Sequence, residues 1–150
     1  MTQRRKARQI ATTYGENALV EAPAIELLAS LGWQTANLYN ETLGTDGTEG
    51  REAEHQVIIT RRLRAALERL NPGLASEAYA QAMDELTRDR SAQIAVNANR
   101  DLFRLLRDRV KVQIKDENGN PDTVDLAVID WDHPDNNDFF LASQKIGRAS

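Results

Sequence analysis

Hydrophobic residues recur with a helical period along the first two thirds of the chain. Apolar side chains spaced three and four positions apart predict helices over residues 22–31, 59–70, 75–86 and 96–108. Pro23 suits the first turn of the first helix and Gly32 follows its end, while Asn71-Pro72-Gly73 stops the second helix. The last three helices are expected to pack together and bury their apolar stripes, including Phe103.

The hydrophobic period changes to two after residue 108. Apolar and polar residues alternate in "VKVQI" at 110–114 and "TVDLAVI" at 123–129, and Asn118-Gly119 between them favours a tight hairpin turn. The second strand is apolar on both faces at its end, so we expect it to be the more buried. "FFLAS" at 139–143 is expected to join the same sheet, and "QTANLY" at 34–39 is a further short strand. The predicted fold class is α+β, with a helical N-terminal part.

Length and composition favour one soluble globular domain. The chain has 150 residues and 41% hydrophobic content, which is enough for a core. No apolar run approaches the ~18 residues that a membrane span needs, and the start "MTQRRKARQIATTYG" lacks the apolar centre of a secretory signal. We therefore expect a cytoplasmic protein without a membrane partner.

Charge and cysteine content narrow the chemistry. The absence of cysteine excludes disulfides and thiolate nucleophiles, and His55 and His133 are the only imidazoles, which disfavours a zinc site. With 19 basic and 23 acidic residues, the chain does not resemble an autonomous nucleic-acid binder. Basic residues do cluster near the start, where residues 1–15 are expected to form a flexible N-terminus; they are Arg4, Arg5, Lys6 and Arg8. The glycine-rich "GTDGTEGRE" at 44–52 is interpreted as a loop between two structural blocks.

The densest polar segment is "IDWDHPDNNDFFLASQ" at 129–144. An EF-hand calcium loop needs oxygen ligands at its positions one, three and five and a glycine at six, whereas counting from Asp130 puts Pro134 at five, and counting from Asp116 puts a proline at six. The triplet Asp130-Trp131-Asp132 has the Asp-x-Asp form of some glycosyltransferases, but three residues are a weak match. Asp and Asn side chains commonly bind backbone amides in turns, so a turn with an exposed His133 is favoured over a metal site.

Two segments carry a resemblance to a known family. "NRDLFRLLRDRVKVQI" followed by "VDLAVIDWDHPDNNDFFLASQ" closely resembles the N-terminal region of the R subunit of type I restriction endonucleases. The shared features are a helix with an Asn-Arg start, a hairpin, an apolar strand, an Asp-Trp pair and the signature Asn136-Asn137-Asp138-Phe139. "ENALVEAPAIELLASLGW" and "GREAEHQVIITRRLRAALERLNPGL" resemble the family's earlier helices, so the resemblance runs from about residue 16 to residue 144.

This resemblance implies a fold and an activity. Residues 16–150 would form the incomplete front part of a PD-(D/E)xK nuclease domain. The parent subunit would carry two ATP-driven helicase-like domains, join methyltransferase and specificity subunits, and cleave double-stranded DNA with Mg²⁺ and ATP as cofactors. Glu21 matches by position the acid on the family's first helix, although the helix dipole also favours a glutamate there.

The remaining nuclease residues of the family follow the signature. They are an Asp and a Glu-x-Lys pair, but residues 145–150, "KIGRAS", contain no acid, and no lysine of the chain follows an acid by two places. The chain alone is therefore expected to lack a complete active site, to hold no cofactor and not to cut DNA.

The signature residues themselves are expected to be structural. Asp130, Asn137 and Asp138 would shape the turn, and Phe139 and Phe140 would anchor the following strand in the core. A different class stays open: a stand-alone interaction module derived from this fold that docks on a methyltransferase and specificity complex. The reading frame after residue 150 separates the two, because a nuclease subunit would continue into the missing acids and a phosphate-binding loop.

Overall fold

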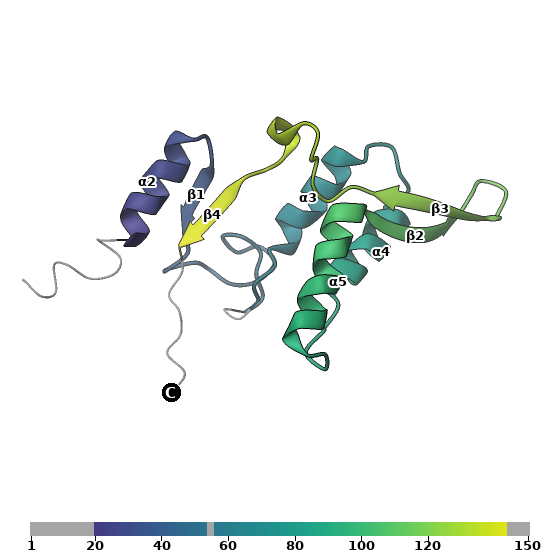
Figure 1. The fold of residues 1–150 in the computed structure, drawn as a ribbon, viewed down its shortest axis with the longest axis horizontal. Coiled ribbons are helices and arrows are strands. Elements are labelled where there is room, and N and C mark those ends of the chain that lie inside the picture. The colour runs from purple at the N-terminus through teal and green to yellow at the C-terminus, as the bar shows by residue number, and fades with distance from the viewer. Residues whose placement is uncertain (1–19, 54–55, 144–150) are drawn as a thin grey trace, which may run out of the picture. The chain divides into compact units, whose positions relative to one another are not determined.

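The computed structural model describes residues 20–53 and 56–143, in which helices and strands combine as an α+β protein (Figure 1). The chain divides into two compact units. The first unit is built from both ends of the chain, up to Glu41 and from Asp138 onward, and the second is Thr42–Asn137. The predicted α+β class is confirmed, whereas the expectations for residues 1–15 and for His55 lie outside the described residues. None of the described helices is long and apolar enough to cross a membrane.

The first unit contains helix α2, Ala22–Ser30, and strands β1, Gln34–Asn37, and β4, Phe140–Ser143. Proline occupies the first turn of α2, and Gly32 follows its end with a φ of 91°. The amide of Gly32 donates to Ala29 O at 3.0 Å and that of Trp33 to Leu28 O at 3.0 Å, which is the Schellman pattern of a glycine-terminated helix. The helix predicted for residues 22–31 is confirmed to within one residue.

Strands β1 and β4 form a parallel pair, with Gln34 opposite Phe140 and Asn37 opposite Ser143. Two further backbone bonds extend the pairing, from Gln34 N to Phe139 O at 2.8 Å and from Leu38 N to Ser143 O at 2.7 Å. The expectation that residues 139–143 join the hairpin sheet is therefore wrong. Alternating hydrophobicity indicates that a segment is a strand, but it does not identify the strand's partner.

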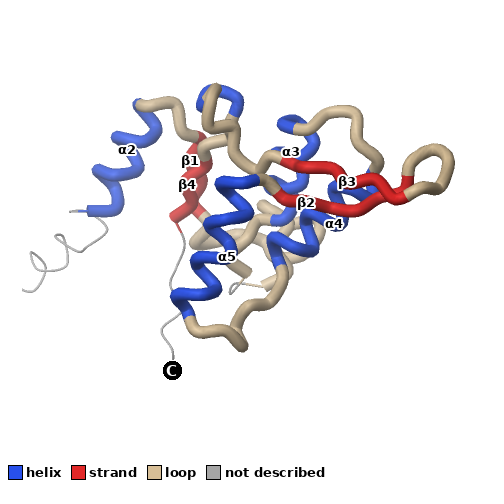
Figure 2. The backbone as a smooth tube through the Cα atoms, turned by 45° about the vertical axis from the view of Figure 1, so that its right-hand side comes forward, coloured by secondary structure: helices blue, strands red, loops and turns tan. Residues whose placement is uncertain are grey.

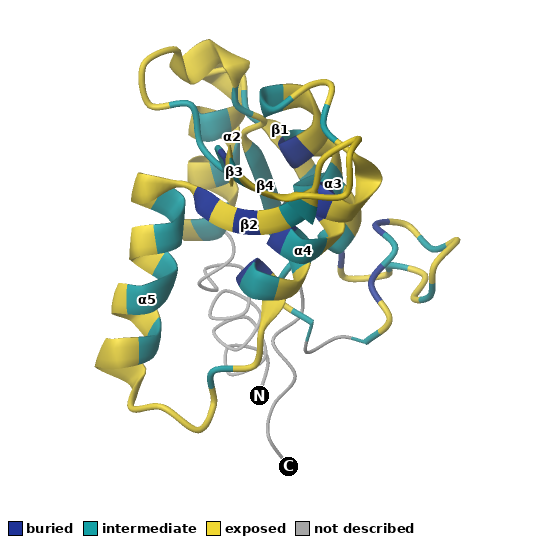
Figure 3. Ribbon diagram, turned by 90° about the vertical axis from the view of Figure 1, so that its right-hand side faces the viewer, coloured by how far each residue is buried: buried dark blue, intermediate teal, exposed yellow. Residues whose placement is uncertain are grey.

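The second unit contains helices α3, Thr60–Leu70, α4, Ser76–Thr87, and α5, Ala95–Asp108, close to their predicted limits. Helix α4 packs against α3 and against strand β2, and Figure 3 shows it next to β2. The buried core joins these helices to the hairpin and consists of Leu67, Ala78, Tyr79, Ala82, Leu86, Val110, Val112 and Leu126.

The hairpin consists of β2, Val110–Lys115, and β3, Pro121–Leu126, in antiparallel register. Its turn is confirmed: Asp116 Oδ1 accepts hydrogen bonds from the amides of Asn118 and Asn120, and Gly119 has a φ of 80°. Buried and exposed residues alternate along β2 (Figure 3). The second strand is not the more buried one, because β2 buries two residues and β3 buries Leu126 alone.

Helix α5 lies on the core without burying any of its own residues completely. Leu102, Leu105 and Leu106 pack partly buried against the core cluster, whereas Phe103 is 54% exposed. The expected burial of Phe103 is wrong, because a helix turns by about 100° per residue and places it at the edge of the leucine stripe. A single residue, Arg109, separates α5 from β2 (Figure 2).

Candidate functional site

The signature segment forms a turn around the carboxylate of Asp130. Its Oδ1 accepts hydrogen bonds from the amides of His133 at 2.9 Å and Asp132 at 3.2 Å. Its Oδ2 accepts one from the side-chain amide of Asn136 at 2.9 Å. A single carboxylate thus fixes three residues that follow it, as Asp side chains commonly do in turns.

Asn137 closes the other side of the turn. Its Oδ1 accepts from the amide of Asp130 at 2.8 Å, and its Nδ2 donates to Asp130 O at 2.9 Å and to Pro134 O at 3.1 Å. A short 3-10 helix, η2, spans Pro134–Asn136 between them. Arg69 Nε donates to Asn136 O at 3.1 Å, so the turn is also attached to the end of α3.

These donors set the electrostatics of Asp130. The Asn136 side chain is the largest cause, followed by the amide of His133, and together they hold the pKa of the Asp130 carboxyl below its ordinary value of 3.8. Both carboxylate oxygens are already occupied by hydrogen bonds. Among the residues that the structure describes, no three His, Asp or Glu side chains come together as a metal ligand set. The described geometry is that of a turn whose polar atoms bind one another.

Trp131 and His133 are among the exposed residues of the turn. Trp131 is 58% exposed, although its Nε1 donates to Leu106 O at 3.2 Å and so ties the turn to α5. The His133 side chain is 76% exposed, with its Nδ1 3.7 Å from Asp130 Oδ1. The exposed histidine expected from the sequence is confirmed.

The rest of the predicted site residues belong to the first unit. Phe139 is 40% exposed and its ring lies 5.1 Å from that of Trp33, so it packs beside β1 and is not buried in a core as expected. Phe140 is half-buried in β4 and Asp138 is exposed. Glu21 directly precedes α2 with a helical backbone conformation, is half-buried, and makes no side-chain capping hydrogen bond.

A polar cluster that the sequence did not reveal lies in residues 42–62. Glu49 is only 8% exposed, and its carboxylate forms a bidentate ion pair with Arg62. Arg62 Nε lies 2.9 Å from Glu49 Oε2, and Arg62 Nη2 lies 3.1 Å from Glu49 Oε1. The hydrogen bond from Arg62 lowers the pKa of Glu49 against the opposing effect of burial. Arg61 adds a bond to Thr48 O at 2.7 Å.

Glycine allows this segment to fold tightly. A Cβ at Gly47 would lie 2.0 Å from Thr42 O, and Gly50 has a φ of 71°, a region that side-chain-bearing residues rarely adopt. Arg51 is also buried and donates from Nη1 to Gln56 O at 2.7 Å. The glycine spacing was visible in the sequence, but the ion pair that joins the segment to α3 was not.

Comparison with known proteins assigns the chain to a family. A family model described as the type I restriction enzyme R protein N terminus matches residues 13–146. The chain belongs to this family. It is 29% identical over 126 residues to the type I restriction enzyme HindI endonuclease subunit of Haemophilus influenzae, strain ATCC 51907 / DSM 11121 / KW20 / Rd. No solved structure matches the chain.

The R protein assignment covers both units, since the matched range includes α2, the Glu49 cluster and the signature turn. The alignment with the HindI subunit covers 83% of this chain but only 12% of that relative. The chain therefore corresponds to an N-terminal region of an R subunit.

Proposed function

We propose that this R protein N-terminal region is the front part of a PD-(D/E)xK nuclease domain. Its parent subunit would act with methyltransferase and specificity subunits to cleave double-stranded DNA, with ATP driving translocation and Mg²⁺ serving the nuclease. The observation that supports this proposal is the family match over residues 13–146. The relative named as an endonuclease subunit points to the same activity.

The parallel pair of the first unit suggests how this region would contribute. A two-stranded sheet is marginally stable in water, and parallel sheets usually occur as larger sheets covered on both faces. All four residues of β4 are only partly buried, and within the described residues β1 and β4 pair only with each other. We therefore propose that further strands of the parent nuclease domain extend this pair.

Glu21 is the residue we assign to the nuclease site of the parent. It lies at the start of α2, which leads directly into β1, and a carboxylate there suits a hard cation such as Mg²⁺. One carboxylate is not a metal site, and the described residues bring no three such ligands together. The chain by itself is therefore proposed not to cut DNA.

Plasmid cleavage tests both parts of this proposal. The purified 150-residue chain is incubated with supercoiled plasmid and Mg²⁺, alongside the full-length R subunit assembled with its methyltransferase and specificity subunits and supplied with ATP. We expect the plasmid to stay intact with the chain and to be cut by the assembled enzyme. Reproducible nicking by the chain that is lost in Glu21→Gln would instead show that this region holds a complete active site.

The role of Glu21 needs a matched comparison in the assembled enzyme. Glu21→Gln removes the proposed ligand, and Glu26→Gln makes the same change at an exposed position of the same helix. We expect Glu21→Gln to abolish cleavage while DNA-dependent ATP hydrolysis continues, and Glu26→Gln to keep both activities. Full cleavage by Glu21→Gln would remove this residue from the nuclease site.

A further inference from the structure

The outer face of α5 carries more positive than negative charge. Six exposed positions lie between residues 97 and 107, and they are Asn97, Asn99, Arg100, Phe103, Arg104 and Arg107. None is a carboxylate, and Asp101 is half-buried at the edge of the inner face. The exposed Asp108 ends the helix and is bound by Arg107. This composition is unusual in a chain whose formal net charge is −4.

The arginines of α5 differ from those of α3 in their contacts. Arg62 of α3 binds Glu49 and Arg64 binds Glu68, so these charges are neutralised within the unit. Arg100 and Arg104 make no hydrogen bond or ion pair with any part of the chain that the structure describes. They are therefore two exposed cations available to a ligand.

Arg107, unlike Arg100 and Arg104, has partners within the chain. Its guanidinium lies 5.6 Å from the centre of the Phe103 ring and makes two 2.6 Å bonds to the carboxylate of Asp108. It is thus largely neutralised, and it covers the ring of Phe103. Arg100 and Arg104 are four residues apart, so a helical rise of 1.5 Å per residue separates them by about 6 Å along the axis.

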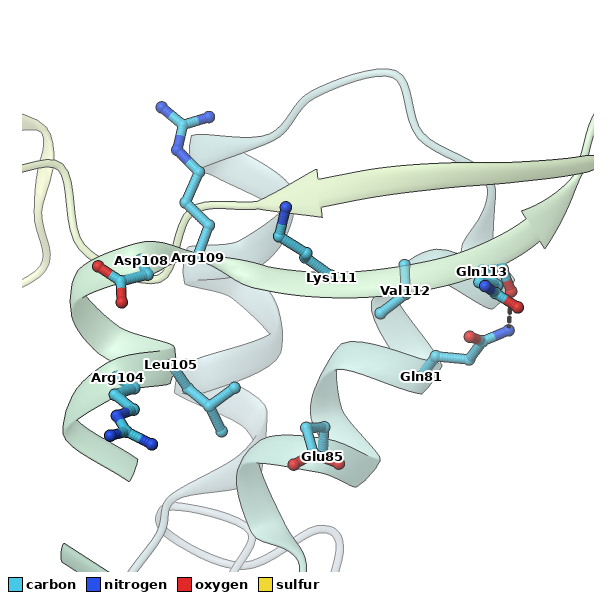
Figure 4. A pocket seen from close by; sticks show the side chains of 9 residues that line it. All are labelled: Gln81, Glu85, Arg104, Leu105, Asp108, Arg109, Lys111, Val112 and Gln113. Carbon is cyan, nitrogen blue, oxygen red and sulfur yellow. Dashed lines mark hydrogen bonds between the residues drawn. The ribbon is translucent and has the colours of Figure 1, made fainter. Parts of the chain in front are cut away.

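A groove with side chains of both charges lies past the end of the helix. The groove has a volume of about 580 Å³. Figure 4 shows Arg104 at one side of it and Lys111 projecting from β2. Leu105 and Val112 also line the groove, together with two acids, Asp108 of α5 and Glu85 of α4. The groove has mixed charge, so the outer face of α5 is the more uniformly basic surface.

We propose that the outer face of α5 binds the phosphate backbone of duplex DNA, with Arg100 and Arg104 as the principal contacts. Arginine and asparagine side chains are common phosphate ligands, and such contacts do not read base sequence. A typical protein interface is centred on a desolvated apolar cluster. Val96 and Phe103, the exposed large apolar side chains of α5, lie about 10 Å apart along the axis with Arg100 between them, and Arg107 covers Phe103. The inference rests on the proposed function in one respect, that DNA is the substrate.

The strength of such binding follows from counterion release. Each neutralised phosphate steepens the dependence of log K on log salt by roughly 0.9, so two contacts give a slope near two and a weak complex at physiological salt. The acidic balance of the chain opposes tighter binding. This surface would help to hold DNA that other subunits have already recognised.

Fluorescence anisotropy with a labelled duplex of arbitrary sequence tests the proposal on the 150-residue chain at about 50 mM salt and above. The variant Arg100→Ala/Arg104→Ala should bind about ten- to a hundredfold more weakly and lose most of the salt dependence. Arg88→Ala/Lys115→Ala removes the same charge from exposed positions outside α5 and should bind nearly as the original chain does. Arg100→Lys/Arg104→Lys keeps both cations and should retain most of the affinity.

Equal weakening of the two double alanine variants, or no measurable DNA binding at low salt, would overturn the proposal. A parallel titration uses polyglutamate in place of DNA. If polyglutamate binds, DNA does not, and the binding depends on Arg100 and Arg104, the ligand is an acidic protein and the DNA proposal is overturned. Far-ultraviolet circular dichroism verifies that each variant is folded. Because cleavage is not measured, α5-dependent DNA binding would stand even if the assembled enzyme failed to cut DNA.

Discussion

The side chain of Asn71 binds both backbone polar groups of Ala127, a residue 56 positions away. Its Oδ1 accepts from Ala127 N at 2.7 Å, and its Nδ2 donates to Ala127 O at 2.8 Å. Tyr79 Oη in turn donates to Asn71 O at 2.5 Å. Asn71, at the end of α3, thus supplies the hydrogen bonds that a neighbouring strand would otherwise give to Ala127. It also joins the helices to the hairpin.

Replacing Asn71 by alanine should therefore be strongly destabilising. The change leaves the amide and carbonyl of Ala127 without partners in a partly buried place, and each such group costs about 1–3 kcal/mol. We expect Asn71→Ala to lower the free energy of unfolding by roughly 3 kcal/mol, measured by urea denaturation. Asn99→Ala makes the same change at an exposed position of α5 and should alter stability by less than about 0.5 kcal/mol.

The Asn71 contact also shows where sequence reasoning stops. The pattern "TVDLAVI" predicts a strand to residue 129, and its apolar residues do turn inward, but the strand ends at Leu126 because a side chain takes over the hydrogen bonds of Ala127. Local periodicity predicted α2, α3, α4, α5 and the hairpin turn well, since each depends on neighbours within a few residues. The pairing of β4 with β1 depends on residues about a hundred positions apart, which no local pattern encodes.

In the candidate site, too, the sequence indicated contacts between near neighbours but not contacts between distant residues. The polar residues from Asp130 to Asn137 attracted attention by composition, and their side chains do bind one another in the structure. The Glu49 and Arg62 pair gave no such signal, because glutamate and arginine at helix starts and in loops are ordinarily exposed. Glu49 becomes buried only when residues 42–53 fold onto α3.

The ion pair between Glu49 and Arg62 should contribute more stability than a surface pair. Glu49→Ala removes a buried partner and leaves Arg62, whose side chain is 28% exposed and can be partly rehydrated. We expect a loss of about 2 kcal/mol, the range of hydrogen bonds to charged groups. Glu68→Ala, which removes the exposed partner of Arg64, should cost about 0.5 kcal/mol or less. Equal losses in the two variants would mean that Glu49 is solvated.

Arg109 stores backbone strain between α5 and β2. Its φ of 72° and ψ of 159° lie in a region that is essentially restricted to glycine. Arg109→Gly should therefore stabilise the chain by about 1 kcal/mol, since relief of 1–3 kcal/mol of strain exceeds the added entropy of an unfolded glycine. Arg109→Ala removes the same side-chain charge but keeps the strain, so its melting temperature should stay close to that of the original chain. A melting temperature of Arg109→Gly below that of the original chain would contradict the proposed strain.

The hydrogen bonds to Asp130 predict a pH dependence of stability. The Asn136 side chain and the His133 amide lower the pKa of Asp130 in the folded state. The charged carboxylate therefore stabilises the fold above the ordinary pKa of 3.8. This contribution to stability is lost as the pH falls through the lowered pKa. Asp130→Asn cannot titrate, so its deficit in urea midpoint against the original chain should be largest near pH 5 and should shrink toward pH 3. Asp132→Asn changes an exposed neighbour in the same turn, and its midpoint should follow that of the original chain throughout. A deficit for Asp130→Asn that stays constant over this range would show that the turn depends on the shape of the side chain and not on its charge.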